Sequence, residues 1–569
     1  MPDADLVETP RVTVRWHHRA LGLLAAVLYA LSHPFAWPGS VEDVTASLAR
    51  PAWLLGFVCL VPLLWAVRRM PARQAYLFSA WAFVPGVFML LHWLTIAMHV
   101  FGGIPKVFSG LLLVLLSIVG WNYMGAAVGV ARWLEDRARW PAWAAVPVCW
   151  TGMEMCRAYI YFGGFPWGNI GTTQWNNLYV AQLGALGGVY LIIVLCGLVN
   201  GVLLEVLRSF LGERPFPSLP VTGAVLALAA SYAYGALHIS AVDDAQAHAP
   251  RVRVGMLQGN VEQGIKNKTM QFREQILAKY EALQRDAVAR GAEVVIWPEG
   301  ALPAHLPRDA DSLRGRGLPD LQGAAGIIGT DIIWQDPPAR TGPECRQPKP
   351  PAGCRGTRWM HNSALVVDPA QGIRGRFDKT HLVPFGEYVP WPLGLVARAI
   401  VPGIAAFVPG QTITPVDVPT REGPRSMGAL ICYEGIFPQY ARRYAARGAQ
   451  LLVNITNDAW YGISAAAPQH LAFYAMRAAE NARAVARVAN TGITAGIDPV
   501  GRVLAPSTLY TDAAVVLDLP LMETPTLYQL TGDVVGWGCA APFLWGLGRG
   551  LREWYQGVKR RRLEKRAGR

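Results

Sequence analysis

Cys432 is the residue of this chain whose setting most clearly suggests chemistry. It lies near the end of the stretch 428–434, which is apolar up to its last residues, as is typical of a buried β-strand. Open α/β sheets present reactive groups in the crevice beyond their strand ends. A thiol is also the nucleophile that depends least on a strong base. The plain alternative is that Cys432 is a small hydrophobic residue of the core.

Two ionisable residues complete the chemistry that a reactive thiol needs. Glu299 ends another apolar stretch, 294–299, and Lys379 lies in the loop 378–388, which glycine and proline punctuate. In acyl transfer through a thioester, a carboxylate removes the thiol proton and returns it to the leaving oxygen. An ammonium group stabilises the developing oxyanion and favours the thiolate. The ordinary interpretations are a surface acid for Glu299 and a solvated loop charge for Lys379.

The elements that must position these residues alternate between strands and helices from residue 251 onward. We predict strands at 252–259, 294–299, 326–333, 362–368, 428–434 and 451–458. We predict helices at 272–290, 436–447 and 468–488, the first with Phe272, Ile276, Tyr280 and Leu283 on one stripe. The segment 335–359 lacks periodicity and is predicted to be a loop. Alternating strands and helices indicate a layered α/β domain.

The first half of the chain has the composition of a membrane protein. Hydrophobic residues make up 52% of the 569 residues, too many for an ordinary soluble protein. Several apolar runs approach the ~20 residues that a helix needs to cross a bilayer. We predict eight spans, near 21–37, 52–67, 77–99, 107–131, 142–160, 178–205, 220–238 and 534–551. The first run follows basic residues as a signal peptide would, but it lacks a small-residue cleavage site and is predicted to be a retained anchor.

The placement of the basic residues predicts the orientation of these spans. The net charge is +13, and its densest clusters flank apolar runs, which argues against nucleic-acid binding. Arg11, Arg15 and Arg19 precede the first run, and the last run is followed by Lys559, Arg560, Arg561, Arg562, Lys565, Arg566 and Arg569. Cytoplasmic loops carry the excess of Lys and Arg. We therefore predict a membrane domain over 1–240, a catalytic domain outside the cytoplasm over 241–530, and an eighth span with a cytoplasmic tail over 531–569.

The eight cysteines form no Cys-x-x-Cys motif and no cluster with zinc-ligand spacing, so we expect no metal and no cofactor. Cys345 and Cys354 lie in the predicted loop outside the cytoplasm, where a disulfide is permitted. The remaining aromatic motif is the glycine-rich loop 163–168 in the membrane half. It fits an interfacial aromatic belt and a substrate-facing loop equally well.

Longer motifs around the three reactive residues resemble a known enzyme superfamily. They are Trp297-Pro298-Glu299, the run from Lys379 to Glu387 that ends in Phe385-Gly386-Glu387, and Ile431-Cys432-Tyr433-Glu434. These are similar to the Glu–Lys–Cys signatures of the nitrilase, or carbon–nitrogen hydrolase, superfamily. Together with the spans, the chain resembles the bacterial apolipoprotein N-acyltransferase family over nearly its whole length. The likeness extends to Gly164-Phe165-Pro166-Trp167, Asn457–Gly462, Gln469-His470 and Asn490–Ala495.

The resemblance implies a nitrilase-like αββα sandwich and acyl transfer in the bacterial inner membrane, with a periplasmic active site. The implied acyl donor is a glycerophospholipid, and the implied acceptor is the α-amine of a diacylglyceryl-cysteine on an apolipoprotein. It also implies that Glu299 is the base, Lys379 the oxyanion stabiliser and Cys432 the nucleophile. The implied supporting residues are Glu387, Tyr433 and Glu434. The expected protein is a monomer.

The sequence departs from the family pattern at one point. Members commonly carry a Trp after a Lys near the first strand, whereas here Lys266 is followed by Asn267. A membrane-anchored amidase would use the same three residues to hydrolyse a small amide, and a non-catalytic scaffold would only bind. The many spans argue against an amidase, which needs one anchor at most. The presence of all three reactive residues argues against a scaffold.

The orientation makes the first testable prediction. A topology reporter fused near Asp309 should behave as a periplasmic protein, because seven spans separate it from a cytoplasmic N-terminus. Alkaline phosphatase activity of such a fusion measures this directly. A cytoplasmic reporter active at the same position would contradict the number of spans.

Overall fold

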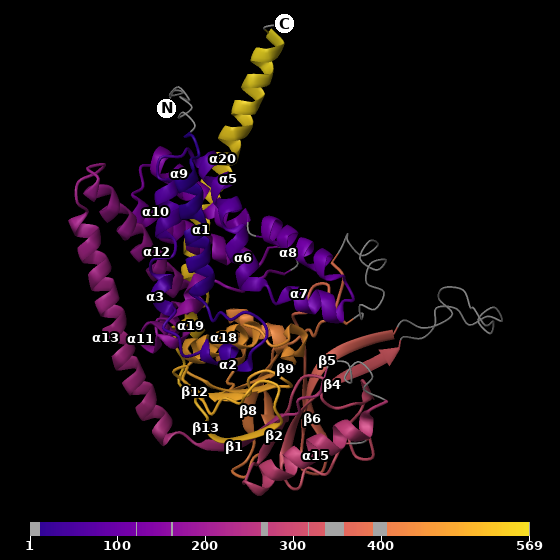
Figure 1. The fold of residues 1–569 in the computed structure, drawn as a ribbon. Helices are drawn as coiled ribbons and strands as arrows, with labels where there is room; N and C mark the ends of the chain where they lie inside the picture. Colours follow the sequence, from indigo (N-terminus) through magenta and orange to yellow (C-terminus); the bar gives the residue numbers. More distant parts are fainter. Residues whose placement is uncertain are drawn as a thin grey trace, which may run out of the picture. The chain divides into compact units, whose positions relative to one another are not determined.

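The computed structural model describes residues 12–120, 122–160, 163–262, 271–316, 318–335, 358–390 and 407–567 (Figure 1). The chain divides into two compact units. One comprises Met1–Pro38, Ala46–Ile239 and Thr531–Arg569, and the other comprises Gly39–Thr45 and Ser240–Leu530. The second unit thus takes a short piece of the N-terminal half, and the Gly39 N–H donates to the Ile463 carbonyl at 3.3 Å.

All regular elements in the described residues of the first unit are helices. Its α-helices are α1 (Trp16–Leu31), α3 (Trp53–Gly56), α4 (Val61–Val67), α5 (Ala72–Ala82), α6 (Val84–Leu91), α7 (Leu94–Ile96), α8 (Lys106–Gly120), α9 (Asn122–Arg137), α10 (Ala142–Arg157), α11 (Leu178–Ala181), α12 (Gly184–Phe210), α13 (Ser218–His248) and α20 (Val534–Ala567). The π-helix η1 (Ala97–Phe101) and the 3₁₀-helix η2 (Ile170–Asn176) join them. The helix α13 continues past residue 239 into the second unit.

Four helical segments are long and apolar enough to cross a membrane, namely Ala72–Leu91, Lys106–Arg137, Gly184–Phe210 and Ser218–His248. The predicted count of eight is not confirmed. The other four predicted runs overlap helices that are shorter or less apolar than these four segments. The helices α1 and α10 have 16 residues each, and Trp53–Val67 is shorter than a span. The helix α20 is long enough, but glycines and Arg549 interrupt its apolar part.

Small residues let several of these helices pack closely. A Cβ on Gly86 of α6 would lie 2.3 Å from the Ala26 carbonyl oxygen of α1. A Cβ on Gly152 of α10 would lie 2.5 Å from the Cys539 carbonyl oxygen of α20. Close backbone approach at small residues is how membrane helices gain packing without a hydrophobic driving force between them. The C-terminal helix α20 therefore packs closely against α10.

The second unit contains two β-sheets covered by helices. The first sheet has the order β13–β1–β2–β4–β5–β6, with β3 paired to β4. Its strands are β1 (Arg251–Gln258), β2 (Val294–Trp297), β3 (His305–Pro307), β4 (Ala325–Gln335), β5 (Arg358–Val367), β6 (Ile373–Asp378) and β13 (Ala513–Pro520). The second sheet has the order β12–β11–β10–β9–β8–β7. Its strands are β7 (Val416–Val418), β8 (Arg425–Ile431), β9 (Leu451–Thr456), β10 (Ala484–Ala489), β11 (Ala495–Ile497) and β12 (Val503–Leu504).

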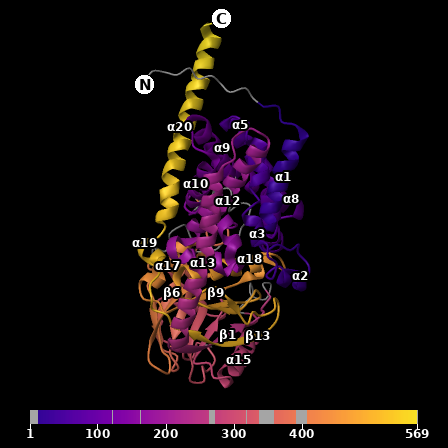
Figure 2. The same cartoon turned by 90° about the vertical axis from the view of Figure 1, so that its left-hand side faces the viewer.

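The layers follow the order helix, sheet, sheet, helix. The two sheets contact each other through β1 with β10 and β5 with β8. The helix α15 (Arg273–Ala289) packs on β1, β2 and β13, while α17 (Pro438–Ala446) and α18 (Ala466–Asn481) pack on the second sheet. Figures 1 and 2 show these helices on opposite sides of the sheets. The remaining helical elements in the described residues of this unit are α2 (Val41–Ala46), α19 (Leu527–Thr531), and the 3₁₀ turns η4 (Cys432–Ile436) and η5 (Asp458–Tyr461). The predicted α/β domain is confirmed.

Apolar packing of α15 on the first sheet fixes the strand that leads to Glu299. Ile276 and Tyr280 of the predicted stripe are buried, and Phe272 and Leu283 pack at the edge of the same core. The Tyr280 ring stacks on Trp297 with 4.6 Å between ring centroids. The Trp297 indole also donates to the Gln284 side chain at 3.2 Å. The end of β2 is therefore held from the helix side.

Several predicted boundaries differ from the structure, and two of the differences change the second sheet. The strand predicted over 428–434 ends at Ile431, because Cys432 has φ +54° and begins the turn η4. The helix predicted over 468–488 ends at Asn481, because Ala482 has φ +46° and closes the helix in the left-handed region. The residues from Ala484 then form the buried strand β10 between β9 and β11. Sheet pairing overrides the helix propensity of an alanine-rich segment.

The contact between α17 and β8 supports the second prediction. A Cβ on Gly428 would lie 2.6 Å from the ring of Tyr444, which is buried against this strand. Gly428→Ala should therefore destabilise the protein by about 1–3 kcal/mol through overpacking. Thermal unfolding of the detergent-solubilised protein measures the loss.

Gly223→Ala is the matched control, because nothing lies within 4 Å of its added Cβ in α13. An alanine there should leave the unfolding temperature unchanged or raise it slightly, since alanine favours a helix. Equal unfolding temperatures for Gly428→Ala and the parent protein would contradict the packing.

Candidate active site

The second unit brings Glu299, Lys379 and Cys432 together from three strand ends. Glu299 follows β2 by two residues, Lys379 follows β6 directly, and Cys432 follows β8 directly. Two of these strands belong to the first sheet and one to the second. Such a site forms only when both sheets are in place.

Lys379 lies between two carboxylates. Its Nζ is 2.8 Å from Glu387 Oε1 and 3.4 Å from Glu299 Oε1, and the side chain is only 1% exposed. Burial acts to lower the pKa of Lys379, but the charges of Glu387 and Glu299 outweigh it and raise the pKa well above its ordinary value. Lys379 is therefore an ammonium ion at neutral pH. The two predicted carboxylates and the predicted lysine form one ionic cluster.

Asn362 in β5 joins the same cluster, and sequence reasoning missed its role. Its Nδ2 donates to Glu299 Oε1 at 2.7 Å and to Glu387 Oε1 at 3.1 Å. The second oxygen of each acid accepts from a backbone N–H, Glu299 from Asn457 at 3.0 Å and Glu387 from Val383 at 2.8 Å. These contacts fix the positions of both carboxylates. Asn362 opens a predicted strand, where an Asn carries no signal that distinguishes it from other polar residues.

Cys432 is held in an uncommon backbone conformation. Its φ of +54° lies in the left-handed region, which costs a residue with a Cβ about 1–2 kcal/mol. The thiol is buried, with the residue 5% exposed. Burial raises the pKa of the Cys432 thiol well above its ordinary value, and the charge of Glu299 raises it further, while Lys379 and a hydrogen bond with Thr456 lower it. The resting sulfur is thus a thiol that needs a base, rather than a thiolate that Lys379 stabilises unaided.

Glu434 connects the lysine loop to the turn that carries the thiol. Its Oε1 accepts from the Thr380 N–H at 2.6 Å, the Thr380 hydroxyl at 2.7 Å and the His381 N–H at 3.2 Å. Its Oε2 accepts from the Ile431 N–H at 2.8 Å. Burial raises the pKa of Glu434 and outweighs the hydrogen bonds that lower it. One carboxylate therefore holds the residues that follow Lys379 and the residue that precedes Cys432.

Tyr433 lies beside these groups in an aromatic cluster. Its ring centroid is 5.5 Å from that of His381 and 5.2 Å from that of Phe437. Burial raises the pKa of the Tyr433 phenol, and burial together with the charge of Lys379 lowers the pKa of His381 to about 4. Both rings are neutral at pH 7 and pack around the turn.

Comparisons with known proteins agree with this geometry. Residues 253–525 match the carbon–nitrogen hydrolase family, and residues 25–202 match the apolipoprotein N-acyltransferase N-terminal domain. An apolipoprotein N-acyltransferase of Geobacter metallireducens is 34% identical over 556 residues, which cover 95% of this chain and 95% of the relative. The chain belongs to the apolipoprotein N-acyltransferase family.

More distant matches accompany these. The apolipoprotein N-acyltransferase of Chlorobaculum tepidum is 28% identical, with 91% of this chain and 94% of the relative covered. Among solved structures, a mutant of the Nesterenkonia AN1 amidase from the nitrilase superfamily is 19% identical with a TM-score of 0.32, covering 51% of this chain and 95% of that chain. The predicted resemblance is confirmed, and the chain is an acyltransferase with a carbon–nitrogen hydrolase domain and membrane helices. The amidase alternative has less support, because the two relatives match 95% and 91% of this chain, including its helical first half.

The glycine-rich loop 163–168 of this acyltransferase is packed inside its own unit. Arg157 donates to the carbonyls of Phe165 at 3.1 Å and Trp167 at 2.8 Å, and it pairs with Glu154. Trp167 is 1% exposed. Gly164 has φ +96°, and a Cβ there would collide with the Ala158 carbonyl. Gly164, Pro166, Trp167 and Gly168 are therefore buried, whereas Gly163 is exposed and Phe165 is half-buried.

Some predicted features lie outside the described residues. These are Lys266 and Asn267, where the family pattern changes, and Cys345 and Cys354 in the predicted loop. Within the described residues, no group of three or more His, Cys, Asp or Glu side chains is arranged to hold a metal.

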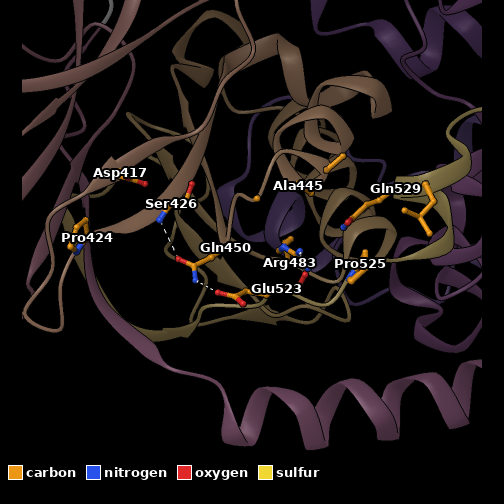
Figure 3. A pocket seen from close by; sticks show the side chains of 12 residues that line it. Asp417, Pro424, Ser426, Ala445, Gln450, Arg483, Glu523, Pro525 and Gln529 are labelled. Atoms are coloured by element: carbon orange, nitrogen blue, oxygen red, sulfur yellow. Dashed lines mark hydrogen bonds between the residues drawn. The ribbon is translucent and has the colours of Figure 1, made fainter.

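A cavity of about 500 Å³ lies elsewhere in the catalytic unit, near the end of α18 (Figure 3). Gln450 crosses it, accepting from the Ser426 N–H at 3.1 Å and donating to Glu523 at 2.6 Å. The buried Arg483 guanidinium donates to the carbonyls of Ala449, Asn481, Ala482, Glu523 and Thr524. Since protein carbonyls engage this cation and none of the three reactive residues lines the cavity, Arg483 supports the fold here.

The contacts of Glu434 give the third prediction. Glu434→Gln keeps the shape but replaces one acceptor oxygen with an NH₂ group that faces backbone N–H donors. Hydrogen bonds to charged groups contribute about 1.5–3 kcal/mol each, so the variant should lose about 2–3 kcal/mol of stability and most of its activity. Thermal unfolding and acyl transfer, measured on the same preparation, test both effects.

Glu422→Gln provides the control. Its side chain is 68% exposed and pairs with Arg425 at the surface, where an ion pair contributes little. A Glu434→Gln protein as stable as this control would show that the connection between the two loops is unimportant.

Proposed function

We propose that this acyltransferase N-acylates apolipoproteins through a thioester on Cys432. The acyl donor is a glycerophospholipid, and the acceptor is the α-amino group of an N-terminal S-diacylglyceryl-cysteine. The observation that carries the proposal is the convergence of a buried thiol, the buried Lys379 ammonium and the Glu299 carboxylate in a chain of this family. A second carboxylate, Glu387, balances the lysine charge.

In the first half-reaction, Glu299 accepts the proton of the Cys432 thiol as the sulfur attacks the ester carbonyl of the donor. The sulfur–carbon bond forms and the carbonyl oxygen becomes an oxyanion, which the Lys379 ammonium stabilises. The carbon–oxygen bond of the ester then breaks. Glu299 returns its proton to the leaving oxygen, and lysophospholipid departs. The raised pKa of the thiol explains why a base is needed for this step.

In the second half-reaction, the amine of the acceptor attacks the thioester. Glu299 takes a proton from the attacking nitrogen, the nitrogen–carbon bond forms and the sulfur–carbon bond breaks. The proton returns to the sulfur and restores the thiol. The burial of this cluster supports transfer to an amine, because a site that excludes water protects the thioester from hydrolysis.

The membrane arrangement belongs to the same proposal. All eight apolar runs cross the bacterial inner membrane, with the N-terminus and the basic tail of α20 in the cytoplasm and the catalytic unit in the periplasm. The positions of the arginines support this orientation. Each of the eight runs overlaps helices of the described structure. We further propose that the enzyme acts as a monomer.

Cys432→Ser is the sharpest test of the mechanism. An alcohol stays protonated where a thiol ionises, and a carboxylate is a weak base for it. The variant should be stably folded and inserted, but transfer should fall by roughly 10³-fold or more, as expected for loss of a nucleophile. Mass spectrometry of protein incubated with phospholipid alone should show an acyl adduct at Cys432 in the parent enzyme and none at Ser in the variant.

Cys156→Ser is the control, because this cysteine lies in α10 of the other unit. It should keep both the adduct and the activity. Near-normal transfer by Cys432→Ser would mean that Cys432 is a core residue and that another group carries the acyl chain.

A further inference from the structure

The Cys432 carbonyl receives two hydrogen bonds that the proposed mechanism does not use. The Tyr474 hydroxyl donates to it at 2.8 Å, and His470 Nε2 lies 3.2 Å from it. Both residues belong to α18, one turn apart on the same face. Both are almost fully buried, at 0% and 1% exposure. Such a pair of donors on one carbonyl fixes the peptide that follows the nucleophile.

His470 is itself held in place by a buried ion pair. Its Nδ1 is 3.0 Å from Asp458 Oδ1 and 3.3 Å from the Arg487 guanidinium, which donates to Asp458 Oδ2 at 2.8 Å. Whichever partner engages Nδ1, Nε2 must carry a proton, because its own partner is a carbonyl oxygen. Burial acts to raise the pKa of Asp458, but the charges of Arg487 and His470 lower it well below its usual range. Asp458 is therefore a carboxylate that orients the imidazole.

The same network reaches the sulfur. The Thr456 hydroxyl donates to Asp458 Oδ1 at 3.3 Å, and its interaction with the Cys432 thiol lowers the pKa of that thiol. Thr456 ends β9, the strand that pairs with β8. The network thus contacts Cys432 at both its carbonyl and its side chain, from the side of α18 and β9.

We propose that His470 and Tyr474 are positioning residues for acyl transfer, which hold the Cys432 carbonyl so that the nucleophile keeps its left-handed conformation. A non-glycine residue stays in that region only when its surroundings determine it several times over. Glu434 holds the N–H of the preceding Ile431, and α18 holds the carbonyl of Cys432 itself. If the carbonyl is released, the turn relaxes and the thiol moves relative to Glu299 and Lys379. This inference rests on the proposed role of Cys432.

The test compares variants that remove or retain each donor in the full-length enzyme. Tyr474→Phe and His470→Leu each remove one hydrogen bond, whereas His470→Gln retains an N–H donor of similar reach. Acyl-enzyme formation is followed by mass spectrometry in phosphatidylethanolamine–phosphatidylglycerol vesicles without acceptor. Tyr474→Phe and His470→Leu should slow it about 10–100-fold, because a misplacement near 1 Å costs up to about 10²-fold. His470→Gln should recover most of the rate.

The amplitude of the reaction separates positioning from folding. A folding defect reduces the fraction of enzyme that ever becomes acylated, whereas a misplaced nucleophile reacts slowly but reaches the same final fraction. Tyr444→Phe is the matched control, since this buried tyrosine packs on β8 at Gly428. It should keep the parent rate. Parent rates in both donor-removing variants, or a lost amplitude with an unchanged rate, would overturn the proposal.

Alkylation of Cys432 by iodoacetamide distinguishes this inference from the proposed function. If the parent enzyme forms no acyl adduct at Cys432, the proposed function fails, and alkylation still reports how the thiol is placed. Rates that fall in Tyr474→Phe and His470→Leu but recover in His470→Gln support the positioning role. Equal alkylation rates in all variants overturn it.

Discussion

The catalytic unit depends on keeping one ammonium ion buried. Lys379 is 1% exposed, and an isolated charge in such a place would cost many kcal/mol or lose its proton. Glu387 and Glu299 compensate the charge, and Asn362 and two backbone N–H groups hold those acids in turn. Removing one partner from a buried ionic group leaves the others uncompensated. The cluster is therefore a single unit in which stability and chemistry cannot be varied separately.

The ionic cluster and the Cys432 thiol come from different sheets. The first sheet supplies Glu299, Asn362 and Lys379, while the second supplies the thiol at the end of β8. Neither sheet alone holds both the Cys432 thiol and the Glu299 carboxylate. Glu434 then joins the sheets by polar contacts, because it follows β8 but accepts from residues that follow β6. The packing of the two sheets therefore determines how Glu299 and Lys379 are placed relative to Cys432.

Cys432 is constrained by two groups of buried side chains. The charges of Glu299 and Lys379 act on its thiol. His470 and Tyr474 contact its carbonyl, and Asp458 and Arg487 hold His470. Both sets of polar groups are buried, where hydrogen bonds are strong and unpaired groups are costly. The left-handed φ of Cys432 is maintained by this surrounding structure rather than by its own preference.

The sequence by itself determined the α/β class of the second half, the apolar character of the first half, and the three residues that the structure brings together with Glu387 and Glu434. Motif residues and hydrophobic periodicity are local properties, so they can be read without coordinates. The tertiary structure decided what depends on contacts between distant segments. It ended the strand before Cys432, converted the end of a predicted helix into β10, and buried Trp167 of the loop 163–168. It also brought Asn362 and His470 to the site, because the hydrogen bonds that select them join residues up to 63 positions apart.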